Sequence, residues 1–369
     1  MKITYVNYYL DKDITVENYF KRYSSVEGWC KCLANSGSDV SVFQRFNKNI
    51  TFRKEKVVYN FCKDEFDNNL KKWQIPFEFH QQILDQNPDI IHINSFKFLV
   101  QACFIKKKSG TAKIIIQHHA EKPHNGLRKY LQLYFSRLID GFIFTSQEIS
   151  KEWINAGALS SKKKIAEIVE NSTDFVNEDK LKARIKTGLT GDPILLWVGR
   201  LNQNKDPITV VLGFKILVRL MPKAKLYMIY SENEMENRIR EIIASDDLLI
   251  SSVKLIGKVE HSLIMDYYNS SDYFVIGSLY ESTCYSLVEA MACGVVPVVT
   301  DIPSFRTITK NGSAGILWKQ GNQYSFLNSM LRILKMDYIE QSELTMNIFK
   351  EELSFEAISN KARLFYSNF

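Results

Sequence analysis

The chain has 369 residues and a net charge of +7, and 45% of its residues are hydrophobic. This composition excludes a disordered chain, and no apolar run reaches the roughly 20 residues that a membrane-spanning helix needs. The length exceeds that of one ordinary core, so we expect two domains. Met1–Val6 leads directly into a strand, and we therefore expect no signal peptide. The six cysteines are scattered without zinc-ligand spacing, which favours buried free thiols in a reducing cytoplasm.

Strands and helices alternate along the first half of the chain, as in a doubly wound parallel sheet. Helices are predicted between these strands, one of them from Ser24 or Ser25 to about Ala34 and another over 127–139. The predicted strands are 3–6, 39–43, 89–93, 112–117, 141–144 and 164–169.

The pattern restarts after a stretch rich in helix breakers, 187–193, which follows a charged helix. We place the domain boundary there and predict domains over 1–185 and 186–354. The second domain is expected to be α/β as well, with helices at 207–220, 233–244, 261–269 and 286–293. Its predicted strands are 194–198, 225–229, 253–256, 273–276 and 295–300.

The basic excess belongs to the first half of the chain. Residues 1–185 contain 29 Lys and Arg against 21 Asp and Glu, a difference of +8. Solvated surface lysines are one interpretation, and attraction to an anionic membrane surface or an acidic acceptor is the other. No basic-aromatic binding motif accompanies the charge, so we expect no nucleic-acid partner.

The first motif that indicates chemistry is Val198-Gly-Arg-Leu-Asn-Gln-Asn-Lys-Asp-Pro207, a strand end followed by a loop. Gly199 allows a ligand to approach the backbone closely, and Pro207 suits the first turn of a helix. Arg200 offers a planar fork and Lys205 a compact charge, a combination that can hold a diphosphate. An ordinary pair of surface cations is the alternative interpretation.

The second motif runs from Glu281 to Gly294 and contains two carboxylates eight positions apart, Glu281 and Glu289. It lies between two predicted strands, so Glu281 falls in a strand-to-helix loop and Glu289 inside the helix. Carboxylates accept hydrogen bonds from the hydroxyls of a ribose or a sugar, and the helix N-terminus between them favours phosphate. A capping loop with a solvent-facing glutamate is the alternative.

Together these motifs, with Pro297, resemble the family 4 retaining glycosyltransferases of the GT-B fold. The resemblance is dense from about Ile194 to Trp318 and looser in the first half, where Asp89–His92, His118 and Asn171–Asp174 match successive landmarks. It implies two Rossmann-like doubly wound α/β domains facing across a cleft, with a last helix at about 355–369 packing back on the first domain.

The resemblance also implies a role for each matching residue. Arg200 and Lys205 would hold the donor diphosphate, Glu289 the ribose, and Glu281 the transferred sugar; no metal or other cofactor is implied. The catalytic set is then Arg200, Lys205, Glu281 and His118. The donor-binding set is Gly199, Arg200, Lys205, Lys258, Val259, Glu281, Ser282, Thr283, Tyr285, Ser286, Leu287 and Glu289.

On the acceptor side, Gly28, His118 and His119 are the candidates. Whether His118 or His119 faces the donor sugar stays open, because both follow a predicted strand. The family often has two glycines in the first loop, whereas this chain has Gly28 alone. The usual Gly-x-Gly is replaced by Tyr230-Ser-Glu232, and Cys284-Tyr-Ser286 replaces a glycine between the two glutamates.

The hypothesis is transfer of a hexose or similar sugar, with retention, from a UDP- or GDP-sugar to a hydroxyl of a glycan, lipid-linked or protein-linked acceptor. A GT-B-fold sugar-nucleotide epimerase and a non-catalytic nucleotide-sugar-binding subunit are the alternatives. The abundance of Lys, Asn, Ile and Tyr hints at an AT-rich bacterial genome and a role in surface polysaccharide or glycoconjugate synthesis. The expected location is the cytoplasm, with peripheral attachment to the inner membrane face.

Overall fold

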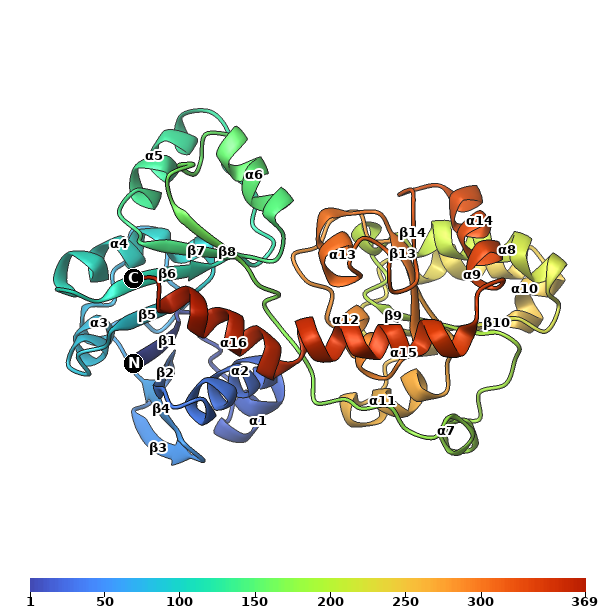
Figure 1. Cartoon of the computed structure of the whole chain (residues 1–369), viewed down its shortest axis with the longest axis horizontal. Helices are drawn as coiled ribbons and strands as arrows, with labels where there is room; N and C mark the ends of the chain where they lie inside the picture. Colours follow the sequence, from blue (N-terminus) through green and yellow to red (C-terminus); the bar gives the residue numbers. More distant parts are fainter. The chain divides into compact units, whose positions relative to one another are not determined.

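A computed structural model describes residues 1–369, which divide into two compact units. The first unit contains Met1–Ser172 and Phe355–Phe369, and the second contains Thr173–Ser354 (Figure 1). Each unit is an α/β domain with its own sheet. No helix in either unit combines the length and the apolar character that crossing a membrane requires.

The sheet of the first unit has eight strands in the order β3-β4-β2-β1-β5-β6-β7-β8. All neighbours pair in parallel except β3, which runs antiparallel to β4 at the edge. The central strands are buried on both faces, which explains their continuous apolar sequences. The strands are β1 (Lys2–Asn7), β2 (Asp39–Arg45), β3 (Ile50–Lys54), β4 (Val57–Cys62), β5 (Ile90–Asn94), β6 (Lys113–Gln117), β7 (Gly141–Phe144) and β8 (Lys164–Glu167).

Helices complete the first unit, and its last helix comes from the far end of the chain. In Figure 1, α16 lies beside α2, and these two helices are in extensive contact. The helical elements are α1 (Val16–Arg22), α2 (Ser24–Asn35), α3 (Phe77–Leu84), η1 (Phe96–Phe98), α4 (Leu99–Lys108), α5 (Leu127–Ser136), α6 (Gln147–Asn155) and α16 (Phe355–Tyr366).

The sheet of the second unit has six parallel strands in the order β11-β10-β9-β12-β13-β14. Its strands are β9 (Ile194–Gly199), β10 (Lys225–Tyr230), β11 (Val253–Gly257), β12 (Tyr273–Ile276), β13 (Val296–Thr300) and β14 (Ile316–Trp318). The helical elements are α7 (Lys180–Thr187), η2 (Gln203–Lys205), α8 (Pro207–Leu220), α9 (Glu236–Ala244), α10 (Asp247–Ser252), α11 (His261–Asn269), α12 (Tyr285–Ala292), α13 (Pro303–Ile308), α14 (Gln323–Ile333), α15 (Tyr338–Ile348) and η3 (Phe349–Leu353).

The boundary between the units lies at Ser172 and Thr173, earlier than the expected position after residue 185. The reason is α7, which packs on α11. Lys180 and Arg184 on α7 both form ion pairs with Asp272, at 2.8 Å and 3.0 Å. The charged helix before the breakers therefore belongs to the second unit, and the breakers lie inside that unit.

Candidate functional site

The second sheet has a topological switch point between β9 and β12. These two strands are neighbours, and the strand order runs outward from them in opposite directions. In parallel α/β sheets, ligands bind outside the carboxyl ends of the strands at such a point. The loops that leave β9 and β12 there carry Arg200, Lys205 and Glu281.

These two loops are held close together by backbone contacts. A side chain at Gly277 would meet the carbonyl oxygen of Asp206 at 2.7 Å, so the approach requires glycine. The backbone N–H of Leu279 donates to the carbonyl of Asn204 at 2.8 Å. The side-chain amide of Asn204 in turn donates to the Tyr280 carbonyl at 2.9 Å. The loop after β9 is thereby fixed against the loop after β12.

Lys205 and Glu281 form an ion pair across the two loops. Their Nζ and Oε1 atoms are 2.7 Å apart, and the side chains are only 9% and 12% exposed. Burial acts to lower the pKa of Lys205, but the charges of the nearby Cys284 and Glu281 groups outweigh it and raise that pKa. Lys205 is therefore a permanent cation in a desolvated position, where its field is weakly screened.

The N-terminus of α12 adds backbone donors beside this pair. Cys284 is the N-cap residue, and its side chain makes no capping hydrogen bond to the helix. Its Sγ atom lies 3.8 Å from the Lys205 ammonium and 3.2 Å from the Ser286 hydroxyl. A helix N-terminus without a side-chain cap, next to a buried lysine, is a favourable position for an anionic group.

Arg200 differs from Lys205 because its guanidinium is exposed. It lies 3.8 Å from the Glu232 carboxylate, and both side chains are 56% exposed. An exposed pair at that distance contributes little to stability. The guanidinium can therefore leave Glu232 for a stronger anion, and Glu232 belongs to the segment that replaces the family's Gly-x-Gly.

Glu289 is buried inside α12 and already has two partners. His261 Nε2 lies 2.8 Å from one carboxylate oxygen, and the Tyr268 hydroxyl donates to the other at 2.9 Å. The hydrogen bond to Glu289 raises the pKa of His261, although partial burial opposes it. Phe175 packs against the His261 ring at a centroid distance of 5.2 Å. No local signal in the sequence linked His261, Tyr268 or Phe175 to the glutamate.

The remaining predicted donor residues lie in three places. Lys258 and Val259 are in the loop between β11 and α11, with Lys258 exposed. Tyr285 opens α12 and is exposed, whereas its neighbours turn inward. The buried neighbours are Ser282, Thr283, Ser286 and Leu287. Thus Arg200, Lys205, Glu281 and Glu289 all lie in the second unit, around the loops and helices that follow its strands.

His118 and His119 lie in the first unit, just after β6, and have different surroundings. His118 is fully buried; its ring stacks on Phe144, and its Nε2 atom lies 2.8 Å from the Glu121 carbonyl. Burial lowers the pKa of His118, even though Glu121 acts in the opposite direction. His119 Nδ1 instead lies 2.5 Å from the Glu170 carboxylate. Burial acts to lower the pKa of His119, but Glu170 raises it overall.

Gly28, predicted on the acceptor side, has a packing role in the structure, and its contact with an acceptor stays a prediction. Gly28 is buried within α2, and a side chain there would meet the Phe355 ring at 2.5 Å. The missing side chain makes room for α16. The contact with α16 involves residues more than three hundred positions apart, so nothing in the local sequence indicated it.

Solved structures share this architecture over the whole chain. A crystal structure of HepE from Anabaena in complex with UDP and glucose matches with a TM-score of 0.70 and 15% identity. The match covers 100% of this chain and 100% of that one. Two parallel-sheet α/β domains with this correspondence define the GT-B fold of glycosyltransferases.

The sequence assigns the chain to one family of that fold. Residues 179–350 match the family described as Glycosyl transferases group 1, and residues 24–168 match Glycosyltransferase Family 4. The chain belongs to the family 4 glycosyltransferases.

Curated relatives agree with the family. UDP-Gal:alpha-D-GlcNAc-diphosphoundecaprenol alpha-1,3-galactosyltransferase of Escherichia coli is 23% identical over 66% of this chain and 66% of its own length. GDP-mannose:cellobiosyl-diphosphopolyprenol alpha-mannosyltransferase of Xanthomonas oryzae is 22% identical over 63% of this chain. The aligned region spans 61% of that second relative, so the chain matches somewhat less than two thirds of either protein.

Proposed function

We propose that the protein transfers a sugar from a UDP- or GDP-sugar to an acceptor hydroxyl, with retention at the anomeric carbon. The observation that carries the proposal is the buried Lys205–Glu281 pair beside the uncapped N-terminus of α12. A cation and backbone donors meet there at the switch point of the sheet, where a diphosphate is well bound. The names of the Escherichia coli and Xanthomonas oryzae relatives, which specify UDP-Gal and GDP-mannose donors, support it.

The chemistry proposed for the site is stabilisation of the leaving nucleoside diphosphate. Negative charge develops on the diphosphate as the bond to the sugar breaks, and fixed positive groups lower the free energy of that state. Lys205 supplies a preorganised charge, and Arg200 is free to move onto the phosphate oxygens. These side chains and the α12 N-terminus carry the charge compensation in this proposal, which includes no metal ion.

Glu281 and Glu289 are proposed to recognise hydroxyl groups of the donor. Glu281 already shares its Oε1 atom between Lys205 and the Asn204 amide, which fixes the orientation of the carboxylate. Glu289 would accept from the ribose, and the ribose hydroxyls would then compete with His261 and Tyr268 for its two oxygens. The exposed imidazole of His261 is the easier of the two partners to displace.

An acceptor-dependent assay tests the proposed transfer. Purified protein incubated with UDP-hexoses, GDP-hexoses and a panel of lipid-linked sugar acceptors is expected to release nucleoside diphosphate only when a suitable acceptor is present. The anomeric configuration of the product, read from its proton NMR coupling constant, is expected to match that of the donor. Conversion of a sugar nucleotide without any acceptor would identify the epimerase instead. Nucleotide binding without turnover of any pair would identify the non-catalytic subunit.

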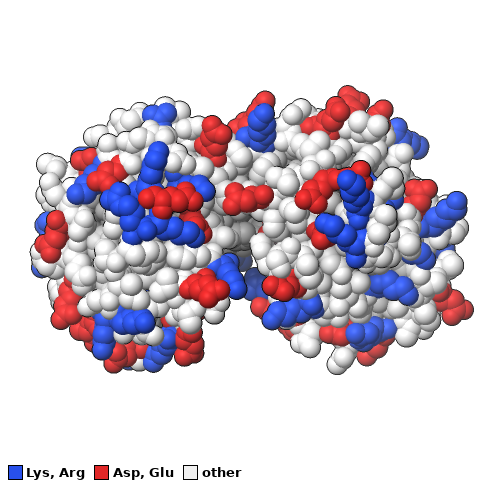
Figure 2. Space-filling model, turned by 90° about the horizontal axis from the view of Figure 1, so that it is seen from below, with Lys and Arg blue, Asp and Glu red and all other residues white.

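We also propose that the first unit attaches to an anionic membrane surface and that the acceptor is lipid-linked. On α5, the exposed side chains Leu127, Tyr130, Leu131 and Tyr134 follow helical spacing and form one apolar stripe. Tyrosine and leucine on one face of an amphipathic helix suit the bilayer interface. The basic excess of +8 in residues 1–185 would attract an anionic surface, and on the face shown in Figure 2 the Lys and Arg side chains are interspersed with Asp and Glu. Both relatives named above have polyprenol-linked acceptors in their names.

Vesicle cosedimentation tests the attachment. The protein is expected to sediment with vesicles that contain anionic phospholipid, and the bound fraction is expected to fall as salt rises. Leu127→Asn should weaken binding, because it removes the most exposed apolar side chain of the stripe. Ile185→Asn is the control, since Ile185 is equally exposed, 84% against 85% for Leu127, but lies on α7 of the second unit. Equal binding by the two variants, or binding that salt does not change, would contradict the proposal.

A further inference from the structure

The first unit contains a cavity of about 400 Å³, and no predicted donor-site residue lines it. Its size lies within the range of small-molecule sites. Residues from the segment before α3, from η1 and α4, from the β6–α5 loop, from α5 and from α6 line it. All of these elements belong to the same compact unit, so the cavity is a property of that unit alone.

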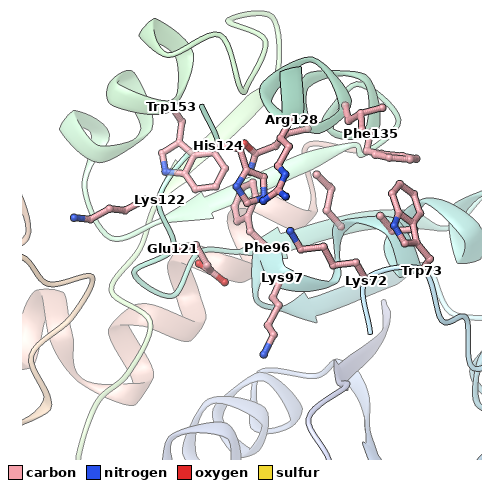
Figure 3. A pocket seen from close by; sticks show the side chains of 14 residues that line it. Lys72, Trp73, Phe96, Lys97, Glu121, Lys122, His124, Arg128, Phe135 and Trp153 are labelled. Carbon is pink, nitrogen blue, oxygen red and sulfur yellow. Dashed lines mark hydrogen bonds between the residues drawn. The ribbon is translucent and has the colours of Figure 1, made fainter. Parts of the chain in front are cut away.

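Aromatic rings form two opposite walls of the cavity. Trp73 and Phe135, with ring centroids 6.1 Å apart, form one wall. Phe96 and Trp153, with ring centroids 4.5 Å apart, form the other. Figure 3 shows these two pairs on opposite sides of the space that the lining residues enclose. Aliphatic side chains, including that of Leu131, complete the lining. Walls of this kind favour an apolar chain over a polar ligand.

Two cations project into the space between these walls. Figure 3 shows Lys72 and Arg128 extending toward each other, whereas Lys97 and Lys122 point away. Neither Lys72 nor Arg128 has a carboxylate within ion-pair distance, so both charges are available to a ligand. Burial lowers the pKa of the neighbouring His124, and the charges of Lys72 and Arg128 lower it further. An anionic group between the two cations would relieve this repulsion.

Buried side chains hold the cationic segments in place. The amide of Gln101, which is almost fully buried on α4, donates to the carbonyls of Lys72 at 3.3 Å and Gln74 at 2.8 Å. The backbone N–H of His124 donates to the side chain of Gln132 on α5 at 2.9 Å. Lys72 and Arg128 therefore project from backbone that is already ordered, which lowers the entropy cost of binding.

The carboxylate of Glu121, which also lines the cavity, already accepts hydrogen bonds from neighbouring groups of the protein. Its carboxylate accepts from the Ser95 hydroxyl at 2.5 Å and from the backbone N–H of His119 at 2.6 Å. Figure 3 places Glu121 on the side of the cavity away from Lys72. Glu121 is thus held by Ser95 and His119 rather than by either of the two cations.

We infer that this cavity binds the lipid part of the acceptor, with the apolar chain between the aromatic walls and a phosphate group between Lys72 and Arg128. The cavity and the apolar stripe of α5 share Leu131, so a lipid chain can pass from the bilayer into the cavity along one helix. This inference rests on the proposed function, because it names the acceptor class of the same reaction. It adds a binding site that the donor chemistry does not require.

Calorimetric titration with farnesyl diphosphate, below its micellar concentration, tests the inference on the whole protein. Farnesyl diphosphate is expected to bind at least about tenfold more tightly than pyrophosphate or farnesol alone, because each of these lacks one of the two contacts. Leu131→Asn and Arg128→Gln are each expected to weaken binding about tenfold. Leu127→Asn and Lys129→Gln are matched controls on the same helix, since neither residue lines the cavity, and are expected to leave affinity unchanged.

Each other result overturns the inference. Equal affinity for pyrophosphate that Arg128→Gln also lowers would make the cavity a phosphate site, and equal losses in the control variants would point to non-specific adsorption on the α5 stripe. No binding by the correctly folded wild-type protein, or its binding of an amphipathic peptide in place of the lipid, would reject a lipid site. The proposed transfer fails independently, through absent turnover of any sugar nucleotide by wild-type protein that still binds farnesyl diphosphate.

Discussion

Replacing Arg200 by alanine is expected to lower kcat by about 10²- to 10³-fold, the effect of removing one donor to a developing anion. The loss should appear in kcat more than in KM, because the guanidinium is proposed to bind the diphosphate most strongly as it leaves. The melting temperature should hardly change, since the side chain is exposed and its contact with Glu232 is long. Steady-state kinetics and differential scanning calorimetry on the same preparation measure both effects.

Arg238→Ala provides the matched control for Arg200→Ala. Arg238 lies on α9 in the same unit and forms an exposed ion pair with Glu241, with side chains 66% and 64% exposed. Its removal should leave both turnover and melting temperature unchanged. Near-normal turnover in Arg200→Ala would refute the role assigned to the guanidinium, and an equal loss in Arg238→Ala would show a general effect of charge.

A double-mutant cycle of Lys205 and Glu281 is expected to show different effects on the free energy of unfolding and on turnover. Lys205→Met should lower the free energy of unfolding by about 3–5 kcal/mol, because it leaves the Glu281 charge buried without its partner. Adding Glu281→Gln removes that charge, and the double variant should recover most of the lost stability. Turnover should be abolished in Lys205→Met, in Glu281→Gln and in the double variant, because each lacks the cation, the carboxylate proposed to bind the sugar, or both. Urea denaturation and donor-turnover assays measure the two quantities.

Two outcomes of this cycle would contradict the site as described. Additive losses of stability in the double variant would show that the two charges do not interact in the folded protein. Recovery of turnover together with stability would show that the pair has only a structural role. The Asn204 amide, which also donates to Glu281, is kept in all variants, so it does not complicate the comparison.

Most of the strands were predictable from the sequence because the central strands of a parallel sheet are continuous apolar runs. The prediction for 273–276 is confirmed by β12, and that for 141–144 by β7. Two neighbouring strands were missed. The antiparallel edge strand β3 is mostly exposed and carries polar residues, whereas β4 (Val57–Cys62) is a largely buried apolar run that was not predicted as a strand. The strand β14 has three residues, too few for a periodic pattern.

The loops of the candidate donor site were predictable from the sequence, whereas the partners of Glu289 were not. The loops that carry Arg200, Lys205 and Glu281 follow apolar strands, and strand order then brings two of those loops together. The partners of Glu289 come from α11 and depend on how that helix packs, which leaves no trace in the local sequence. The packing role of Gly28 was not predictable, because Phe355 lies on a helix at the far end of the chain.

The contact between Gly28 and Phe355 can form only late in the synthesis of the chain. The space over α2 is filled by residues 355–366, which leave the ribosome only after the entire second unit has been made. Until α16 has been synthesised, the apolar surface of α2 that it covers stays exposed in the first unit. The second unit consists of one continuous segment and can fold as soon as that segment is complete. The nascent first unit is therefore the part of this protein that is most exposed to chaperones and to aggregation.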